Sequence, residues 1–138
     1  MLQDDFKMTG RLSIAINDEV VQEVKNLVVT SGKGFVASRM KDATAGAMSH
    51  MAVGTGSSAA AASNAALGSE VDRNALASTT VSGANISYVA TFAAGEGTGA
   101  LTEAGLFNAG SSGTMLCRTV FAVVNKGVAD SMTITWTV

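Results

Sequence analysis

The chain has 138 residues, which is enough for one domain with a hydrophobic core and too short for two such domains. Only 14% of its residues are charged, the net charge is −2, and no cluster of Lys or Arg is present to attract nucleic acid or an anionic membrane. Apolar residues make up 47% of the chain, so its surface is weakly protected against association. This composition is typical of a protein that packs against other proteins.

Cysteine content and hydropathy indicate the cellular setting. The single cysteine, Cys117, excludes a disulfide within the chain and indicates synthesis in a reducing compartment. Residues 1–11 (MLQDDFKMTGR) lack the apolar stretch of a signal peptide. No window approaches the roughly 18 uninterrupted apolar residues of a spanning segment, so we expect no membrane-spanning helix.

The first predicted elements are a hairpin and a helix. Residues 11–17 (RLSIAIN) alternate apolar and polar side chains, which predicts a half-buried strand. A polar turn at residues 17–19 and a returning strand within residues 20–30 complete the hairpin. Ser31 is placed to cap a short helix over residues 32–42, whose larger side chains recur at helical spacing.

The middle of the chain contains a glycine turn between two predicted elements. Residues 48–53 (MSHMAV) predict a short strand that leads into the turn GTGSSA at residues 54–59. A second short helix is expected over residues 63–71, with Leu67 and Val71 facing inward.

Strands dominate the rest of the chain. Residues 85–92, 114–124 and 131–138 have apolar alternation or continuous apolar runs, and glycine-containing segments separate them. The sequence therefore predicts a mainly β protein, an antiparallel β-sandwich of jelly-roll type with one or two short helices.

We expect residues 1–138 to form a single β-sandwich domain. Within it, residues 1–30 are interpreted as an amino-terminal hairpin region and residues 31–138 as the main sandwich. The predicted core contains large side chains from the predicted strands and apolar runs: Tyr88, Phe92, Leu106, Phe121, Ile134 and Trp136.

The turn GTGSSA has the G-x-G-x-x-A spacing of a dinucleotide-binding turn. In such proteins the turn opens a long helix inside a parallel βαβ unit, and an acidic residue about 20 positions later binds the ribose. Glu70 and Asp72 lie near that distance, but neither ends a second strand and no parallel sheet is predicted. We therefore interpret the motif as a glycine turn and expect no cofactor.

Two residues with catalytic potential are interpreted as structural. His50 is the only histidine, so no histidine pair is present to bind zinc, and it lies beside an apolar strand. Cys117 lies inside a predicted strand, where a buried inert thiol is the ordinary outcome. We expect no metal site and no catalytic residues. An enzyme would have to use His50 with Glu103.

Charges inside apolar strands need partners when buried. Glu103 in LTEAGLF and Arg118 in LCRTVF are such charges, and Asp72 and Arg73 are further candidates. We expect Glu103 or Arg118 to be buried in a structural ion pair, either with each other or with Arg73 and Asp72.

The run from Met115 to Val124 is apolar on both faces, so its outer face needs a cover. We expect the hairpin strand VVQEV to supply part of that cover and a partner chain to supply the rest.

A family resemblance extends over residues 26–138. These residues contain, in order, the segments NLVVTSGKGFVASRM, SHMAVGTG, ALGSEVDR, LTEAGLFNAGSSGTMLCRTVF and DSMTITWTV. The order resembles small virion proteins of tailed bacteriophages, in particular capsid cement (decoration) proteins with a jelly-roll fold. Tail-fibre and collar segments share the VGTG turn, the E-x-G-L-F strand and the T-W-T ending.

The resemblance implies a structural role outside an assembled head. Such a protein binds the major capsid protein, joins neighbouring capsomers and often forms a dimer or trimer with itself. It is made in the host cytoplasm and resides on the capsid exterior, with no nucleic-acid or membrane partner. The alternatives are a tail-fibre or collar module that binds a receptor, and a small enzyme that uses His50 and Glu103.

Overall fold

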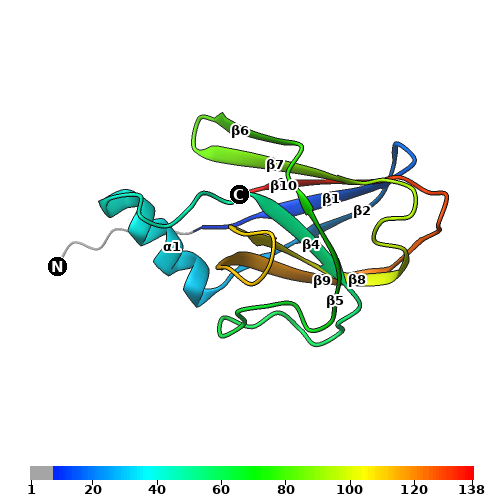
Figure 1. Ribbon diagram of the computed structural model, residues 1–138, viewed down its shortest axis with the longest axis horizontal. Helices are drawn as coiled ribbons and strands as arrows, with labels where there is room; N and C mark the ends of the chain where they lie inside the picture. The colour runs from blue at the N-terminus through cyan, green and yellow to red at the C-terminus, as the bar shows by residue number, and fades with distance from the viewer. Residues whose placement is uncertain (1–7) are drawn as a thin grey trace.

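The protein is a sandwich of two antiparallel sheets with one helix at its side (Figure 1), described by a computed structural model over residues 8–138. The elements in chain order are β1 (Arg11–Ile16), β2 (Glu19–Lys25), β3 (Leu27–Val28), α1 (Thr30–Lys41), β4 (His50–Gly54), β5 (Glu70–Ala75), β6 (Ser78–Ser82), β7 (Asn85–Phe92), β8 (Gly99–Phe107), β9 (Met115–Lys126) and β10 (Met132–Thr137). The first sheet has the order β2-β1-β10-β7-β6 and the second has the order β3-β9-β8-β4-β5. The predicted mainly β sandwich is confirmed, while the jelly-roll type stays a prediction.

The predicted hairpin is present and forms one side of the first sheet, with β2 as its edge strand. Asn17 and Asp18 form its tight turn with φ of 50° and 67°, a left-handed conformation that Asn and Asp tolerate better than most residues. Strand β1 pairs with β2 on one side and with β10 on the other, where Leu12 lies opposite Trp136. The hairpin is therefore continuous with the sheet, and no structural boundary lies at residue 30.

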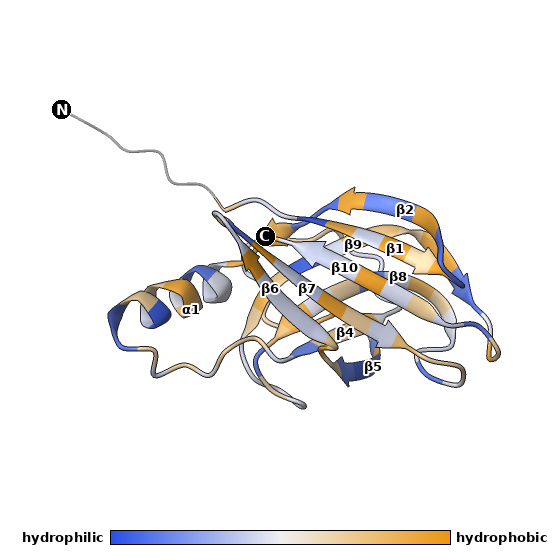
Figure 2. Ribbon diagram, turned by 90° about the horizontal axis from the view of Figure 1, so that it is seen from above, coloured by the Kyte–Doolittle hydropathy of each residue, from blue (hydrophilic) through white to orange (hydrophobic). Residues whose placement is uncertain are grey.

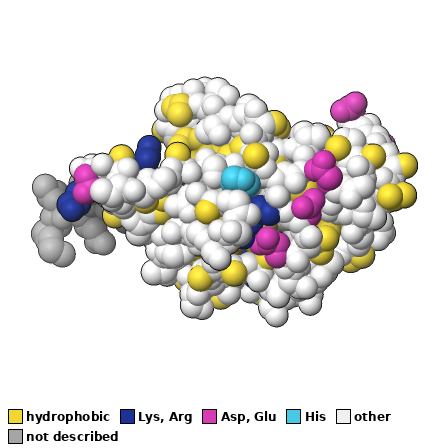
Figure 3. Space-filling view, in the orientation of Figure 1, with side chains coloured by type: hydrophobic (Ala, Val, Ile, Leu, Met, Phe, Trp, Pro, Cys, Tyr) yellow, Lys and Arg dark blue, Asp and Glu magenta, His cyan; other side chains and the backbone are white. Residues whose placement is uncertain are grey.

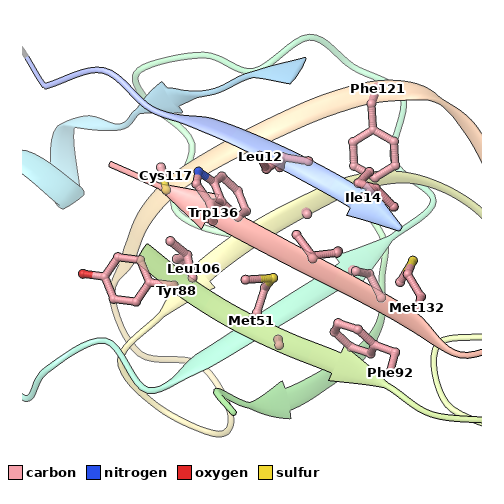
Figure 4. Packing of buried hydrophobic residues seen from close by; sticks show 14 of the residues in the cluster. Leu12, Ile14, Met51, Tyr88, Phe92, Leu106, Cys117, Phe121, Met132 and Trp136 are labelled. Atoms are coloured by element: carbon pink, nitrogen blue, oxygen red, sulfur yellow. The ribbon is translucent and has the colours of Figure 1, made fainter. Parts of the chain in front are cut away.

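The core lies between the two sheets and follows the alternation of the strands (Figure 4). Side chains of β1, β7 and β10 point from the first sheet toward those of β4, β8 and β9 in the second, because every second residue of a strand faces the same side. The predicted core is confirmed, since all six of its side chains are buried: Tyr88, Phe92, Leu106, Phe121, Ile134 and Trp136.

One of the two predicted helices is present. Helix α1 begins at Thr30 and ends at Lys41, but Ser31 does not cap it, because the helix starts after Val29 without a side-chain cap. The Ser31 hydroxyl instead donates to the Met115 carbonyl at 3.2 Å. Gly32 is buried where the helix approaches β9, and a Cβ there would lie 2.0 Å from the Leu116 carbonyl oxygen. Glycine therefore weakens the isolated helix but lets it contact the sheet.

The prediction of a second helix over residues 63–71 is wrong. The chain forms an irregular loop over residues 55–69 and then enters β5, and Val71 is exposed rather than inward-facing. Leu67 does face inward, against the outer side of the second sheet. The loop does not form a helix because its backbone N–H groups donate to the side chain of Glu103, a partner distant in the sequence.

The cover of β9 also differs from the expectation. The hairpin lies in the first sheet, and hydrogen bonds join it to β9 at two places. Gln22 donates to the Ala122 carbonyl, and the Thr119 hydroxyl donates to the Lys25 carbonyl at 2.8 Å. The loop of residues 55–69 and the start of α1 cover the outer face of the first half of β9. The chain thus supplies its own cover there, and Val123 in the second half remains exposed. Among residues 8–138, no helix is long and apolar enough to cross a membrane.

Candidate functional site

Glu103 on β8 and Arg118 on β9 form a buried ion pair on the outer face of the second sheet. The Arg118 Nε and Nη2 atoms donate to the Glu103 Oε1 atom at 3.1 and 2.9 Å. The side chains are 0% and 2% exposed, so both charges are removed from water and depend on each other. The structure thus contains the first of the two pairings that the sequence left open.

The two ends of the loop of residues 55–69 donate hydrogen bonds to this same carboxylate. Gly56 N–H and Ser69 N–H donate to Oε2 of Glu103, each at 2.7 Å, and Gly68 N–H donates to Oε1 at 2.8 Å. A Cβ on Gly56 would lie 2.5 Å from Oε2, so only glycine permits this close approach. The glycine turn thus contributes one of three backbone N–H groups that bind an anion, and that anion is a side chain of the protein itself.

Asn64 completes the site and was missed in the sequence. Its Oδ1 atom accepts from Arg118 Nη1 at 3.0 Å and from the Ala61 N–H at 2.8 Å. The Thr102 hydroxyl donates to the Gly56 carbonyl at 2.7 Å and holds the start of the loop. No local sequence pattern indicates this role, because Asn64 and Arg118 are 54 positions apart in the chain.

The electrostatics of Glu103 are set by two opposing effects. Burial by itself raises the pKa of the carboxyl, because the charged form loses water. The N–H groups of the loop and the Arg118 guanidinium stabilise the charged form more strongly, so the net pKa lies below its ordinary value. The site therefore holds a carboxylate whose hydrogen-bonding capacity is already occupied.

Arg73 pairs with Glu70 rather than with Asp72. Its Nε and Nη2 atoms donate to the Glu70 carboxylate at 3.2 and 2.7 Å, and its guanidinium lies 3.8 Å above the centre of the Phe107 ring. Its Nη1 atom donates to the carbonyls of Ala109 and Ser112, in the loop between β8 and β9. The Asp72 carboxylate accepts the backbone N–H of Arg73, and the second pairing that the sequence left open, of Glu103 and Arg118 with Arg73 and Asp72, is not formed.

The pair that catalysis would require is not assembled. His50 lies opposite Phe107 in the β4–β8 ladder, whereas Glu103 lies opposite Gly54, four positions along β4. At about 3.3 Å per residue, the two positions are about 13 Å apart. The His50 Nδ1 atom instead shares a hydrogen bond of 2.7 Å with the hydroxyl of Ser49.

The other candidates do not form a chemical site either. Cys117 is 0% exposed, and burial raises the pKa of its thiol far above the ordinary value, so it is a buried thiol as expected. The glycine turn leads into a loop rather than a helix, and Glu70 is occupied by Arg73, so neither feature of a dinucleotide site is present. Within residues 8–138, no group of three or more His, Cys, Asp or Glu side chains is placed to bind a metal.

The accessible features are apolar surfaces at two ends of the sandwich. One end, which we call the valine end, carries the exposed side chains of Val20, Val21, Val123 and Val128, which are 47–70% exposed. The other end has a groove of about 370 Å³, which we call the β6 groove. Helix α1 and strands β6 and β7 supply most of its walls: Phe35, Val36, Arg39, Met40, Thr79, Val81, Ile86 and Tyr88. Figure 3 shows how few charged side chains interrupt the uncharged surface on one face.

Aromatic side chains do not form a sugar-binding platform in the described part of the chain. Five aromatic side chains are buried there and Phe35 is half-buried against the core. Comparison of the chain with models of protein families, with curated proteins and with solved structures finds no match.

Proposed function

We propose that this chain is a non-enzymatic virion protein that binds the outer surface of a bacteriophage capsid and cements neighbouring capsomers. The resemblance of residues 26–138 to capsid cement proteins suggests the role, and a jelly-roll type of sandwich belongs to the same proposal. The observation that carries it is the presence of two apolar surfaces at opposite ends of one sandwich. A protein that joins subunits needs at least two contact surfaces.

The strand register places these surfaces at opposite ends. Met132 at the start of β10 pairs with Ile16, next to the hairpin turn, and Val20 pairs with the neighbouring Ala15. At the other end of the same sheet, Val138 bonds to Ile86, which lies opposite Val81. Figure 1 shows the hairpin turn at one end and α1 with the β6–β7 turn at the other. The two surfaces can therefore contact different partners at once.

The chemistry of the valine end favours a protein partner. Its four valines are 47–70% exposed, so binding there gains apolar burial. We assign this end to the major capsid protein. Binding should consequently depend on apolar area more than on salt concentration.

The experiment adds purified protein to expanded heads that lack it and images the heads by cryo-electron microscopy. We expect regular decoration by the unmodified protein and loss of decoration by Val20→Lys combined with Val123→Lys. The control is Val71→Lys on β5, because Val71 is 45% exposed and lies outside both surfaces. The control should decorate as the unmodified protein does.

The location of the protein in intact particles distinguishes the capsid role from the tail alternative. Antibodies against the chain should label heads in purified phage. Labelling of tail fibres or collars, together with undecorated heads in the mixing experiment, would overturn the capsid role and favour a tail module.

A further inference from the structure

Strand β6 is an unprotected sheet edge. Exposed edges attract other strands, and proteins commonly protect them with charges, proline or very short strands. Strand β3 has two residues, β2 contains Glu19, Glu23 and Lys25, and β5 contains Glu70, Asp72 and Arg73. By contrast, β6 (STTVS) has no charge and no proline, and all of its residues are exposed. Among residues 8–138 no strand pairs with its outer side.

The backbone groups that face outward on β6 follow from the register. The Ile86 N–H donates to the Val138 carbonyl and the Ile86 carbonyl accepts from the Val138 N–H, each at 2.9 Å, so the backbone groups of Ile86 point away from β6. Val81 lies opposite Ile86, and its N–H and C=O therefore point away from β7. The same alternation directs the backbone groups of Thr79 outward. The edge thus presents donors and acceptors at Thr79 and Val81.

The same two residues line the β6 groove. Thr79 and Val81 lie beside Tyr88 and Ile86 of β7, and all four face α1 across the groove. Val81 is 69% exposed and Met40, on the helix side, is 81% exposed. Figure 2 shows α1 standing beside the β6–β7 end of the first sheet, with apolar bands along the strands. An incoming strand on β6 would therefore also cover apolar surface.

We infer that the partner at this edge is a second copy of the chain, whose β6 pairs antiparallel with the first about a twofold axis at Thr80. In this arrangement Thr79 of one copy lies opposite Val81 of the other, and their outward N–H and C=O groups form hydrogen bonds with each other. Both side chains lie on the groove side, so the two grooves become one continuous apolar interface. The sheets of the two copies join into one sheet across the dimer.

The self-complementarity of β6 argues for a second copy over a different protein. Reversal of the strand about Thr80 places the outward backbone groups of Thr79 opposite those of Val81, so they can hydrogen-bond to each other as a twofold contact requires. The neutral strand meets a neutral strand, so no like charges come together. This inference names a surface for the self-association that the family resemblance behind the proposed function implies, and it leaves the valine end free.

The test measures the oligomeric state of the purified full chain by sedimentation velocity over a series of concentrations. We expect a dimer for the unmodified protein and a monomer for Val81→Lys, which places two ammonium groups in the joined groove. The matched control is Val20→Lys, because Val20 is 57% exposed on the opposite edge strand of the same sheet. This control should remain a dimer.

A second variant tests the backbone pairing itself. Thr79→Pro removes an N–H that points outward, so the β6–β7 ladder should survive and the dimer should be lost. In the unmodified protein, amide hydrogen exchange at Thr79 and Val81 should slow at least tenfold as the dimer forms. Circular dichroism of each variant checks that the sandwich is folded.

Three results would overturn the inference: a monomeric unmodified protein, a Val81→Lys variant that stays dimeric, or a trimer. If the unmodified protein is monomeric and a folded Val81→Lys variant no longer decorates heads, the partner of the β6 edge is a strand of the capsid protein instead. Dimerisation and decoration are measured separately, so either proposal can fail while the other stands.

Discussion

Glu103 shows how a single buried charge organises a region of the protein. Its carboxylate accepts three backbone N–H groups and the Arg118 guanidinium, so no lone pair faces an apolar surface. Such a pair adds little stability relative to a well-packed apolar alternative, but removal of one partner leaves the other charge buried without a partner. The site is therefore expected to fix one loop conformation.

We predict that Glu103→Gln destabilises the protein by about 3–5 kcal/mol at neutral pH. The amide removes the charge that compensates Arg118, and its NH₂ group turns a donor toward the N–H groups of the loop. Adding Arg118→Met should recover part of the loss, because no buried charge then remains. Urea unfolding of the two single variants and the double variant gives the coupling energy. A loss under about 0.5 kcal/mol in the single variant, typical of surface changes, would contradict the burial of the pair.

The pH dependence of stability should identify the same carboxyl. The pKa of Glu103 lies below its ordinary value of 4.5 in the folded protein, so the unfolded chain binds more protons in this range. Its contribution is fully present above the unfolded pKa and is lost as the pH falls through the folded pKa. We therefore expect stability to drop below about pH 5. Glu103→Gln should show a shallower drop, which urea unfolding at pH 3–7 measures. Equal pH profiles would contradict the lowered pKa.

At the scale of elements, the loop of residues 55–69 is the least predictable segment. It has no regular structure, yet Gly56, Gly68 and Ser69 anchor it to Glu103, and Asn64 anchors it to Arg118. The loop covers the outer side of β8 and β9 in place of a third layer. Its order should therefore depend on these anchors.

We predict that Gly56→Ala destabilises the protein by about 1–3 kcal/mol, as overpacking does, because its Cβ would lie 2.5 Å from the Glu103 carboxylate. Gly34→Ala is the control, since a Cβ at this helical position meets nothing within 4 Å. That change should stabilise α1 by about 0.5–1 kcal/mol. Thermal unfolding measures both, and amide exchange at Gly68 and Ser69 should quicken only in Gly56→Ala. A neutral Gly56→Ala would contradict the close approach.

At the scale of the molecule, one core joins both sheets and both ends of the described chain. Strand β1 lies between β2 and β10, and Trp136 of β10 is 0% exposed within the same cluster as Met51 and Leu106 of the second sheet. In Figure 4 the indole lies beside Cys117 of β9, from the opposite sheet. Neither sheet can therefore lose its packing alone.

We predict a single cooperative unfolding transition for the whole sandwich. Trp136 fluorescence reports packing between the sheets, and far-ultraviolet circular dichroism reports the strands of both. Their midpoints in urea should coincide, as in a two-state transition. A circular-dichroism transition at a clearly different midpoint would indicate that the hairpin and the rest of the chain unfold separately.

The sequence by itself determined what depends on neighbouring residues. Alternation along β1, β7 and β10 predicted the strands and the buried face, because successive side chains of a strand point to opposite sides. The turn at Asn17 and Asp18 predicted the hairpin for the same local reason. A charge inside an apolar strand predicted a buried pair, since an unpaired charge there is costly.

Only the tertiary structure decided which distant groups meet. The partner of Glu103 includes N–H groups of Gly56, Gly68 and Ser69, and every residue has such a group, so no residue type marks the site. For this reason the helix over residues 63–71 was expected, and the glycine turn resembled a site for a bound phosphate. Likewise, composition does not distinguish cover by the chain's own loop from cover by a partner, because both bury the same apolar face. The path of the chain in space decides between them.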